Sequence, residues 1–215
     1  MLLACWSVKG GVGTSVVAAS LALVLANDGV EPVTLVDLGG DQSALLGLPA
    51  TPPQGVAHFL DSQADVDAFE RIAVPVANRL QLITRGPGAG PLPSSSSARL
   101  LSALTAMRGD VVVDCGSWGD PLALDIASAA SHSLLVMRCC YLALRKAAAC
   151  TTKPSTIVLV TEEGRALGSR EVEDVLGVPV SAQIPWEPRI ARAVDAGLLV
   201  SRLPRALERA IRNAA

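Results

Sequence analysis

The sequence predicts a doubly wound α/β fold, in which helices flank both faces of a mostly parallel β-sheet. Two observations lead to this class. Short runs of Val, Leu and Ile alternate with helix-length segments, and a glycine-rich loop joins the first run to the first helix. Continuous apolar runs are typical of parallel strands that helices cover on both faces. We find no internal repeat and no domain boundary, so we expect a single domain over 1–215.

The first three elements form a βαβ unit. The sequence predicts a buried strand at 2–8, a helix at 15–28 and a second strand at 32–40. The helix ends at Asn27-Asp28-Gly29, a typical helix stop. Two strands joined by a crossover helix are parallel neighbours in one sheet.

The remaining elements continue the alternation. We expect further strands at 79–86, 110–116, 132–138, 155–161 and 178–185, and helices at 98–107, 121–130, 141–150, 169–177, 188–197 and 204–213. The Gly-, Pro- and Ser-rich segment 86–97 could be a linker, but strands of the same kind lie on both sides of it. We therefore interpret it as a surface loop.

Composition and charge exclude several classes of protein. Half of the residues are apolar and only 3% are aromatic, so Ala, Val and Leu must build the core. The net charge of −2 argues against a protein that coats nucleic acid with its whole surface. No basic patch precedes the first apolar run, and the longest apolar stretch is too short to cross a bilayer. We expect a soluble, cytoplasmic protein.

Cysteine usage gives no sign of a metal or disulfide framework. None of the five cysteines forms a CxxC pair, and the two histidines have no obvious partner. Buried, reduced thiols are the expected state.

The loop "KGGVGTS" at 9–15 carries the clearest chemical signal. A loop between a strand and a helix turns successive backbone N–H groups toward an anion. Gly10, Gly11 and Gly13 allow the backbone to approach a phosphate closely, and Val12 lies among them. A hydroxyl at Ser15, in the first helical turn, is placed to coordinate Mg²⁺.

The loop resembles the deviant Walker A motif of the ParA/MinD family of P-loop ATPases, usually KGGxGK[ST]. Three further segments match the family in the same order: 36–49 is similar to switch I, 110–117 to the Walker B strand, and 184–200 to the nucleotide-flanking loop and helix. The resemblance covers nearly the whole chain. It implies a P-loop NTPase fold of the SIMIBI type, with ATP and Mg²⁺ as ligands and a nucleotide-dependent homodimer.

The resemblance assigns roles to individual positions. Lys9 matches the lysine that reaches the partner's phosphates across the dimer interface. Residues 10–15, including Thr14, match the phosphate loop, and Ser15 and Asp114 match the Mg²⁺ site. Asp37 matches the first acid of switch I. Pro185 and Glu187 match positions beside the base.

Two positions depart from the family pattern. Thr14 replaces the second Walker lysine, and Gly39 replaces the second switch I acid, which positions the attacking water. Asp41 could substitute for that acid only in a shifted loop register. Because in-line attack needs the water held and charge stabilised together, we expect slow hydrolysis or none, and a weak ATPase at most. Loss of the Walker lysine is a feature of CpaE/TadZ-like members, which this chain resembles most.

The favoured function is a spatial organiser that positions a pilus, secretion, division or chromosome-related complex. A nucleotide-free pseudo-ATPase scaffold and a nonspecific DNA-binding partitioning ATPase remain as alternatives. A ligase or kinase would need a substrate pocket that nothing in the sequence specifies. We interpret the helix in the Arg-rich segment 189–212 as a core helix, with DNA contact or peripheral membrane contact as alternatives. Trp118 and Trp186 are expected to flank the site, either packed against neighbouring loops or available to a partner.

Overall fold

The computed structural model describes residues 1–50, 52–87, 90–117 and 119–214 and confirms the doubly wound α/β fold. Its strands are β1 (Leu2–Ser7), β2 (Val33–Asp37), β3 (Val74–Ala77), β4 (Leu80–Ile83), β5 (Asp110–Ser117), β6 (His132–Arg138), β7 (Thr156–Thr161) and β8 (Val180–Pro185). They form one sheet in the order β3-β4-β2-β5-β1-β6-β7-β8. Every neighbouring pair in it is parallel except β3 and β4.

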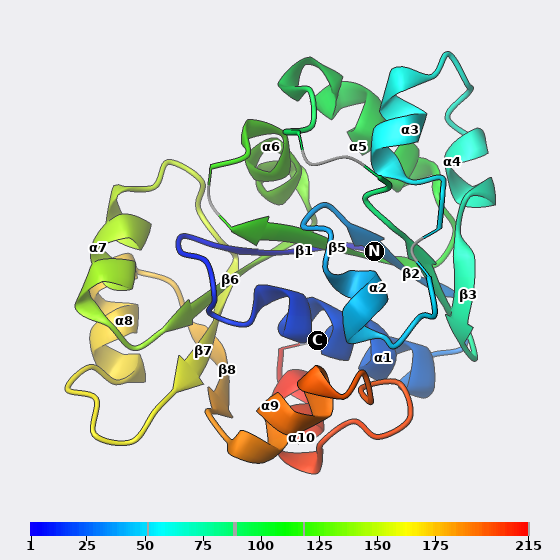
Figure 1. Cartoon of the computed structure of the whole chain (residues 1–215). Helices are drawn as coiled ribbons and strands as arrows, with labels where there is room; N and C mark the ends of the chain where they lie inside the picture. Colours follow the sequence, from blue (N-terminus) through cyan, green and yellow to red (C-terminus); the bar gives the residue numbers. More distant parts are fainter. Residues whose placement is uncertain (51, 88–89, 118, 215) are drawn as a thin grey trace.

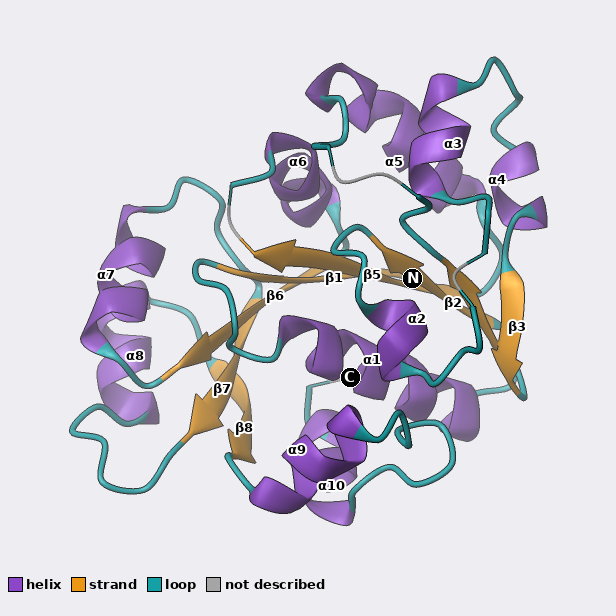
Figure 2. Cartoon of the chain, viewed as in Figure 1, coloured by secondary structure: helices purple, strands orange, loops and turns teal. Residues whose placement is uncertain are grey.

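Helices cover both faces of this sheet, as the continuous apolar runs predict (Figures 1 and 2). One face packs against α3 (Val56–Asp61), α4 (Ala68–Arg71), α5 (Ser97–Ala106), α6 (Pro121–Ala129), α7 (Tyr141–Ala149) and α8 (Ser169–Leu176). The other packs against α1 (Thr14–Asp28), α2 (Gln42–Leu45), α9 (Pro188–Asp195) and α10 (Arg205–Arg212).

The first helix is the most enclosed of the major helices. In α1, both the side toward the sheet and much of the opposite side are buried, because α2 and α10 lie against it. The last helix, α10, buries Leu207, Ala210 and Ile211 against α1 and β8. This packing agrees with the core-helix interpretation of its apolar face.

Several elements differ from those that the sequence predicts. The second and third expected strands shorten to five and four residues, because each gives way to a loop at its carboxyl end. The antiparallel strand β3 and the short helices α2, α3 and α4 are not predicted. β3 lies at the edge of the sheet, where Pro75 is tolerated because its missing N–H is not needed.

The state of the cysteines and the lengths of the helices bear on disulfide and membrane chemistry. All five cysteines are free, and four of them are buried. Among the described residues, no helix combines the length and the apolar composition needed to cross a membrane.

Candidate functional site

The phosphate-binding loop predicted at 9–15 runs from the end of β1 to the start of α1. Gly11 and Gly13 adopt φ angles of +72° and +99°, a region that side chains with a Cβ rarely occupy. In the described chain, none of the backbone amides of residues 10–16 donates to a backbone carbonyl. Unpaired amides at a helix start form a binding site for an anion.

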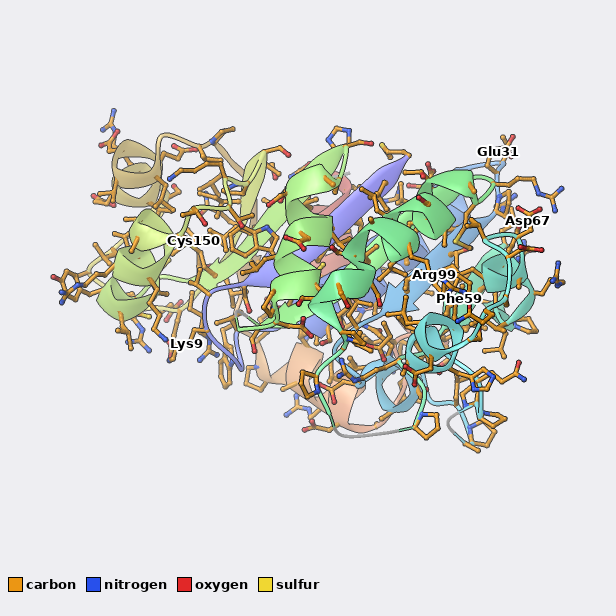
Figure 3. The ribbon with its side chains drawn as sticks, turned by 90° about the horizontal axis from the view of Figure 1, so that it is seen from above. Lys9, Glu31, Phe59, Asp67, Arg99 and Cys150 are labelled. Carbon is orange, nitrogen blue, oxygen red and sulfur yellow. The ribbon has the colours of Figure 1, made fainter. Side chains whose placement is uncertain are left out.

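Hydrogen bonds hold the beginning of this loop against β5. The Ser7 hydroxyl contacts the carbonyl oxygens of Lys9 at 3.1 Å and Gly116 at 3.3 Å. The Lys9 side chain is exposed, and Figure 3 shows it at the rim of the molecule on the side of α7, away from α3 and α4. Lys9 thus faces outward, the orientation that contact with a second subunit would require.

Two buried carboxylates lie below the loop. Asp37 is the last residue of β2 and lies opposite Asp114 of β5, and neither is more than 1% exposed. Asp37 accepts hydrogen bonds from the amides of Gly40 at 2.6 Å and Gln42 at 3.0 Å. Burial, with a contribution from the Asp114 charge, raises the pKa of Asp37 to about 6.

Asp114 has a different set of hydrogen-bond partners. It accepts hydrogen bonds from the Gly116 amide at 3.0 Å and the Gln42 side chain at 2.8 Å. Burial raises the pKa of Asp114, while hydrogen bonding with Ser15, Gln42 and Gly116 opposes the shift. The predicted metal pair, Ser15 and Asp114, is therefore brought together.

Gln42 is a residue of this site that the sequence analysis missed. Its buried Nε2 group donates to both Asp114 and the Ser15 carbonyl, 2.9 Å away. It thereby joins the segment after β2 to the start of α1 and to β5. The Gln42 Oε1 atom is buried and finds no donor among the described residues. No local motif marks Gln42, since only the fold brings it to Asp114.

A cleft of about 640 Å³ opens above the loop. Residues of the loop line it, namely Gly10, Gly11, Gly13, Thr14 and Ser15. Residues of other segments complete the lining, among them Gly39, Asp41, Gly116, Ser117 and Asp195. A second hollow of about 210 Å³ shares Gly11, Gly13, Val16, Val194 and Asp195 with the cleft. The hollow is also lined by Val12, Arg138, Pro185, Trp186 and Glu187. The cleft and the hollow are thus contiguous, and residues of the loop line both.

The predicted site residues fall into three groups. Residues 10, 11 and 13–15 line the cleft with Asp41, while Val12, Pro185 and Glu187 line the hollow. Asp37 and Asp114 lie buried beside the cleft, and Lys9 lines neither space. Trp186 lines the hollow and is 50% exposed, whereas Trp118 lies outside the described residues. The role of each stays a prediction.

Thr14 and Gly39, the two positions that depart from the motif, both line the cleft. Thr14 is the first residue of α1, is 6% exposed and lines the cleft. A Cβ on Gly39 would lie 3.6 Å from both the Asp37 and Asp114 carboxylates, in ordinary contact. Position 39 therefore has room for a Cβ. Asp41 is exposed and lies at the start of α2.

The donor set fits a nucleotide with Mg²⁺. Among the described residues, no three His, Cys, Asp or Glu side chains converge as a metal cage. Metal binding would therefore need the Ser15 hydroxyl, Asp114 and ligand or water oxygens, all hard donors that suit Mg²⁺. The unpaired Gln42 Oε1 would also gain a donor from ordered water. A bound Mg²⁺ would supply charge neutralisation at the phosphates.

Comparison with known proteins places this arrangement in a structural class. The chain has the fold of the ParA/MinD ATPases, with a sheet and flanking helices that match across nearly its full length. No protein-family model matches the sequence, and no curated protein matches it either.

Three solved structures illustrate the similarity. A ParA family ATPase from Chlorobium tepidum TLS matches with a TM-score of 0.78 and 20% identity, over 97% of this chain and 94% of that one. MinD from Pyrococcus horikoshii OT3, complexed with Mg-ADP, matches at 0.77 and 18%, over 98% and 92%. An ATP complex of a Cyanothece McdA variant matches at 0.77 and 15%, over 100% and 96%.

Proposed function

We propose that this chain is an ATP- and Mg²⁺-binding spatial organiser of the ParA/MinD type, closest to CpaE/TadZ-like members. It acts as a single-domain homodimer that closes on nucleotide and positions a pilus, secretion, division or chromosome-related complex. The observation that carries the proposal is the phosphate loop at the floor of a cleft that continues into a second hollow. Within the described chain, the backbone amides of residues 10–16 donate to no backbone carbonyl.

Hydrolysis is slow or absent in this proposal. Thr14 removes a cation from the phosphates, and Gly39 removes the acid that would hold the attacking water. The backbone cradle and the pair of Ser15 and Asp114 are retained. Binding therefore survives better than turnover, and the bound dimer selects its partner through surfaces that the free monomer does not present.

Calorimetric titration with Mg²⁺·ATP, followed by sedimentation, tests the proposal. Wild type should bind ATP and dimerise with it. Lys9→Ala should bind more weakly and stay monomeric, because dimerisation adds to the apparent affinity. Lys153→Ala is the matched control, since Lys153 is also exposed and lines neither space.

The alternatives give different outcomes in the same experiment. Absence of binding at millimolar ATP would support the nucleotide-free scaffold. Retention on nonspecific duplex that falls steeply with salt would support the DNA-binding ATPase. The exposed arginines Arg189, Arg192, Arg202, Arg205 and Arg209 are the residues on which such binding would depend.

A further inference from the structure

The nucleotide site has an unusual charge balance. Among the described residues that line the cleft and the hollow, three are acids: Asp41, Glu187 and Asp195. Asp37 and Asp114 add two buried carboxylates beside them. The same two linings contain one basic side chain, that of Arg138. A nucleoside triphosphate carries several negative charges, so a site with this balance needs each cation it has.

The fold places Arg138 next to the phosphate loop. Arg138 is the last residue of β6, and β6 pairs in parallel with β1, the strand that leads into the loop. The carboxyl ends of parallel neighbours lie at one edge of the sheet, where open α/β sheets bind their ligands. Arg138 shares the hollow with Gly11, Val12 and Gly13 of the loop.

Arg138 is also available to a ligand. Its side chain is half-buried, and within the described chain it forms no ion pair. Two other arginines, which follow β4 and β7, already have partners within the chain. Arg85 donates to the carbonyl oxygens of Leu38 and Gly90, and Arg165 pairs with Glu162 at 2.6 Å.

We propose that Arg138 is the second cation of the nucleotide site and binds the phosphate chain in place of the lysine that Thr14 replaces. This inference rests on the proposed nucleotide binding and names a residue for it. A guanidinium suits this role because it keeps its charge and presents several N–H donors to phosphate oxygens. It reaches the phosphates from the end of β6, whereas the usual lysine reaches them from the start of the helix.

Titration with Mg²⁺·ATP and with adenosine, which lacks phosphates, tests the assignment. Arg138→Gln should weaken ATP binding about 10- to 150-fold, the range for one charge-assisted hydrogen bond, and leave adenosine binding unchanged. Arg138→Lys should retain most of the ATP affinity. Arg145→Gln is the control, because Arg145 is exposed on α7 and lines neither space.

The outcomes distinguish failure of the proposed function from failure of the Arg138 assignment. If wild type binds no ATP, the proposed function and this inference both fail. If wild type binds and Arg138→Gln binds equally well, only the role of Arg138 is refuted. Equal losses for ATP and adenosine would assign Arg138 to the base or ribose and overturn the phosphate contact. Thermal unfolding of each variant identifies any loss that comes from misfolding.

A double variant distinguishes phosphate binding by Arg138 from a merely structural role. If the cation at 138 compensates for the one missing at 14, Thr14→Lys should restore the ATP affinity of Arg138→Gln. The gain from Thr14→Lys should be larger in that background than in wild type. Equal gains in both backgrounds would show that the two positions act independently, and would contradict compensation.

Discussion

Gly39→Asp would place an acid where the ParA/MinD motif has the second acid of switch I, beside the buried carboxylates of Asp37 and Asp114. A Cβ at this position meets no atom closer than 3.6 Å, so the added Cβ causes no steric clash. Its carboxylate would lie beside those of Asp37 and Asp114, and a charge separation of about 5 Å serves for an order-of-magnitude cost. At an effective dielectric constant of about 20, repulsion from one ionised neighbour costs about 3 kcal/mol. We expect nucleotide-free Gly39→Asp to be less stable by about this amount near neutral pH.

Denaturant unfolding at two pH values measures this cost. Asp37, with a pKa of about 6, is mostly protonated at about pH 5, so the penalty should shrink there. Gly39→Asn is the matched control, since it adds nearly the same volume without charge. Mg²⁺·ATP should offset the penalty, and Gly39→Asp should hydrolyse ATP faster than wild type. If the Asp and Asn variants unfold alike at both pH values, the carboxylate cluster is not placed as the structure has it.

Three other predictions concern stability. Gln42→Ala removes the donor to Asp114 and the Ser15 carbonyl and should cost about 2–3 kcal/mol by denaturant unfolding; a loss below about 0.5 kcal/mol would contradict this role. The raised pKa of Asp37 means that the folded state binds more protons than the unfolded state between about pH 4 and 6. Stability of the nucleotide-free protein should therefore fall by up to about 3 kcal/mol as pH rises through this window, and an unchanged denaturation midpoint would refute it. Gly47→Ala should destabilise by more than Gly177→Ala, because both glycines have φ near +65° to +70° but only a Cβ at 47 meets a backbone atom, the Gly197 carbonyl oxygen at 2.6 Å. Equal melting temperatures for these two variants would show that the Gly47–Gly197 contact relaxes at no cost.

Local sequence patterns were sufficient for the main architecture and for the phosphate loop. The strands of the sheet centre are continuous Val- and Leu-rich runs, and each is buried on both faces as that pattern requires. The short helices α2, α3 and α4 have four to six residues, too few for a helical period to be visible. The edge strand β3 depends on pairing with β4, which no local pattern predicts.

Motifs already marked the loop and the acids Asp37 and Asp114 as site residues, whereas Gln42 and Arg138 carry no motif. Residues 9–15 are adjacent in sequence, so their spacing already implied a cradle. Gln42 lies 72 residues from Asp114, and only the pairing of β2 with β5 makes them neighbours. Arg138 reaches the phosphate loop through the pairing of β6 with β1. An arginine at a strand end gives no signal of this in the sequence.

Relative to the ParA/MinD motif, the residues at positions 14 and 39 remove charges of opposite sign. Thr14 removes a positive charge and Gly39 removes a negative one, so the net charge of the site is unchanged. Phosphate binding depends on overall charge and on the backbone amides, and both survive this exchange. In the proposed function, water attack depends on a carboxylate and a cation placed together, and neither position 39 nor position 14 supplies one here. Under the proposed function, the two substitutions therefore weaken turnover more than binding. A protein that holds a nucleotide without consuming it would stay dimeric until a partner or a fall in nucleotide releases it, and this lifetime is the property that a spatial organiser requires.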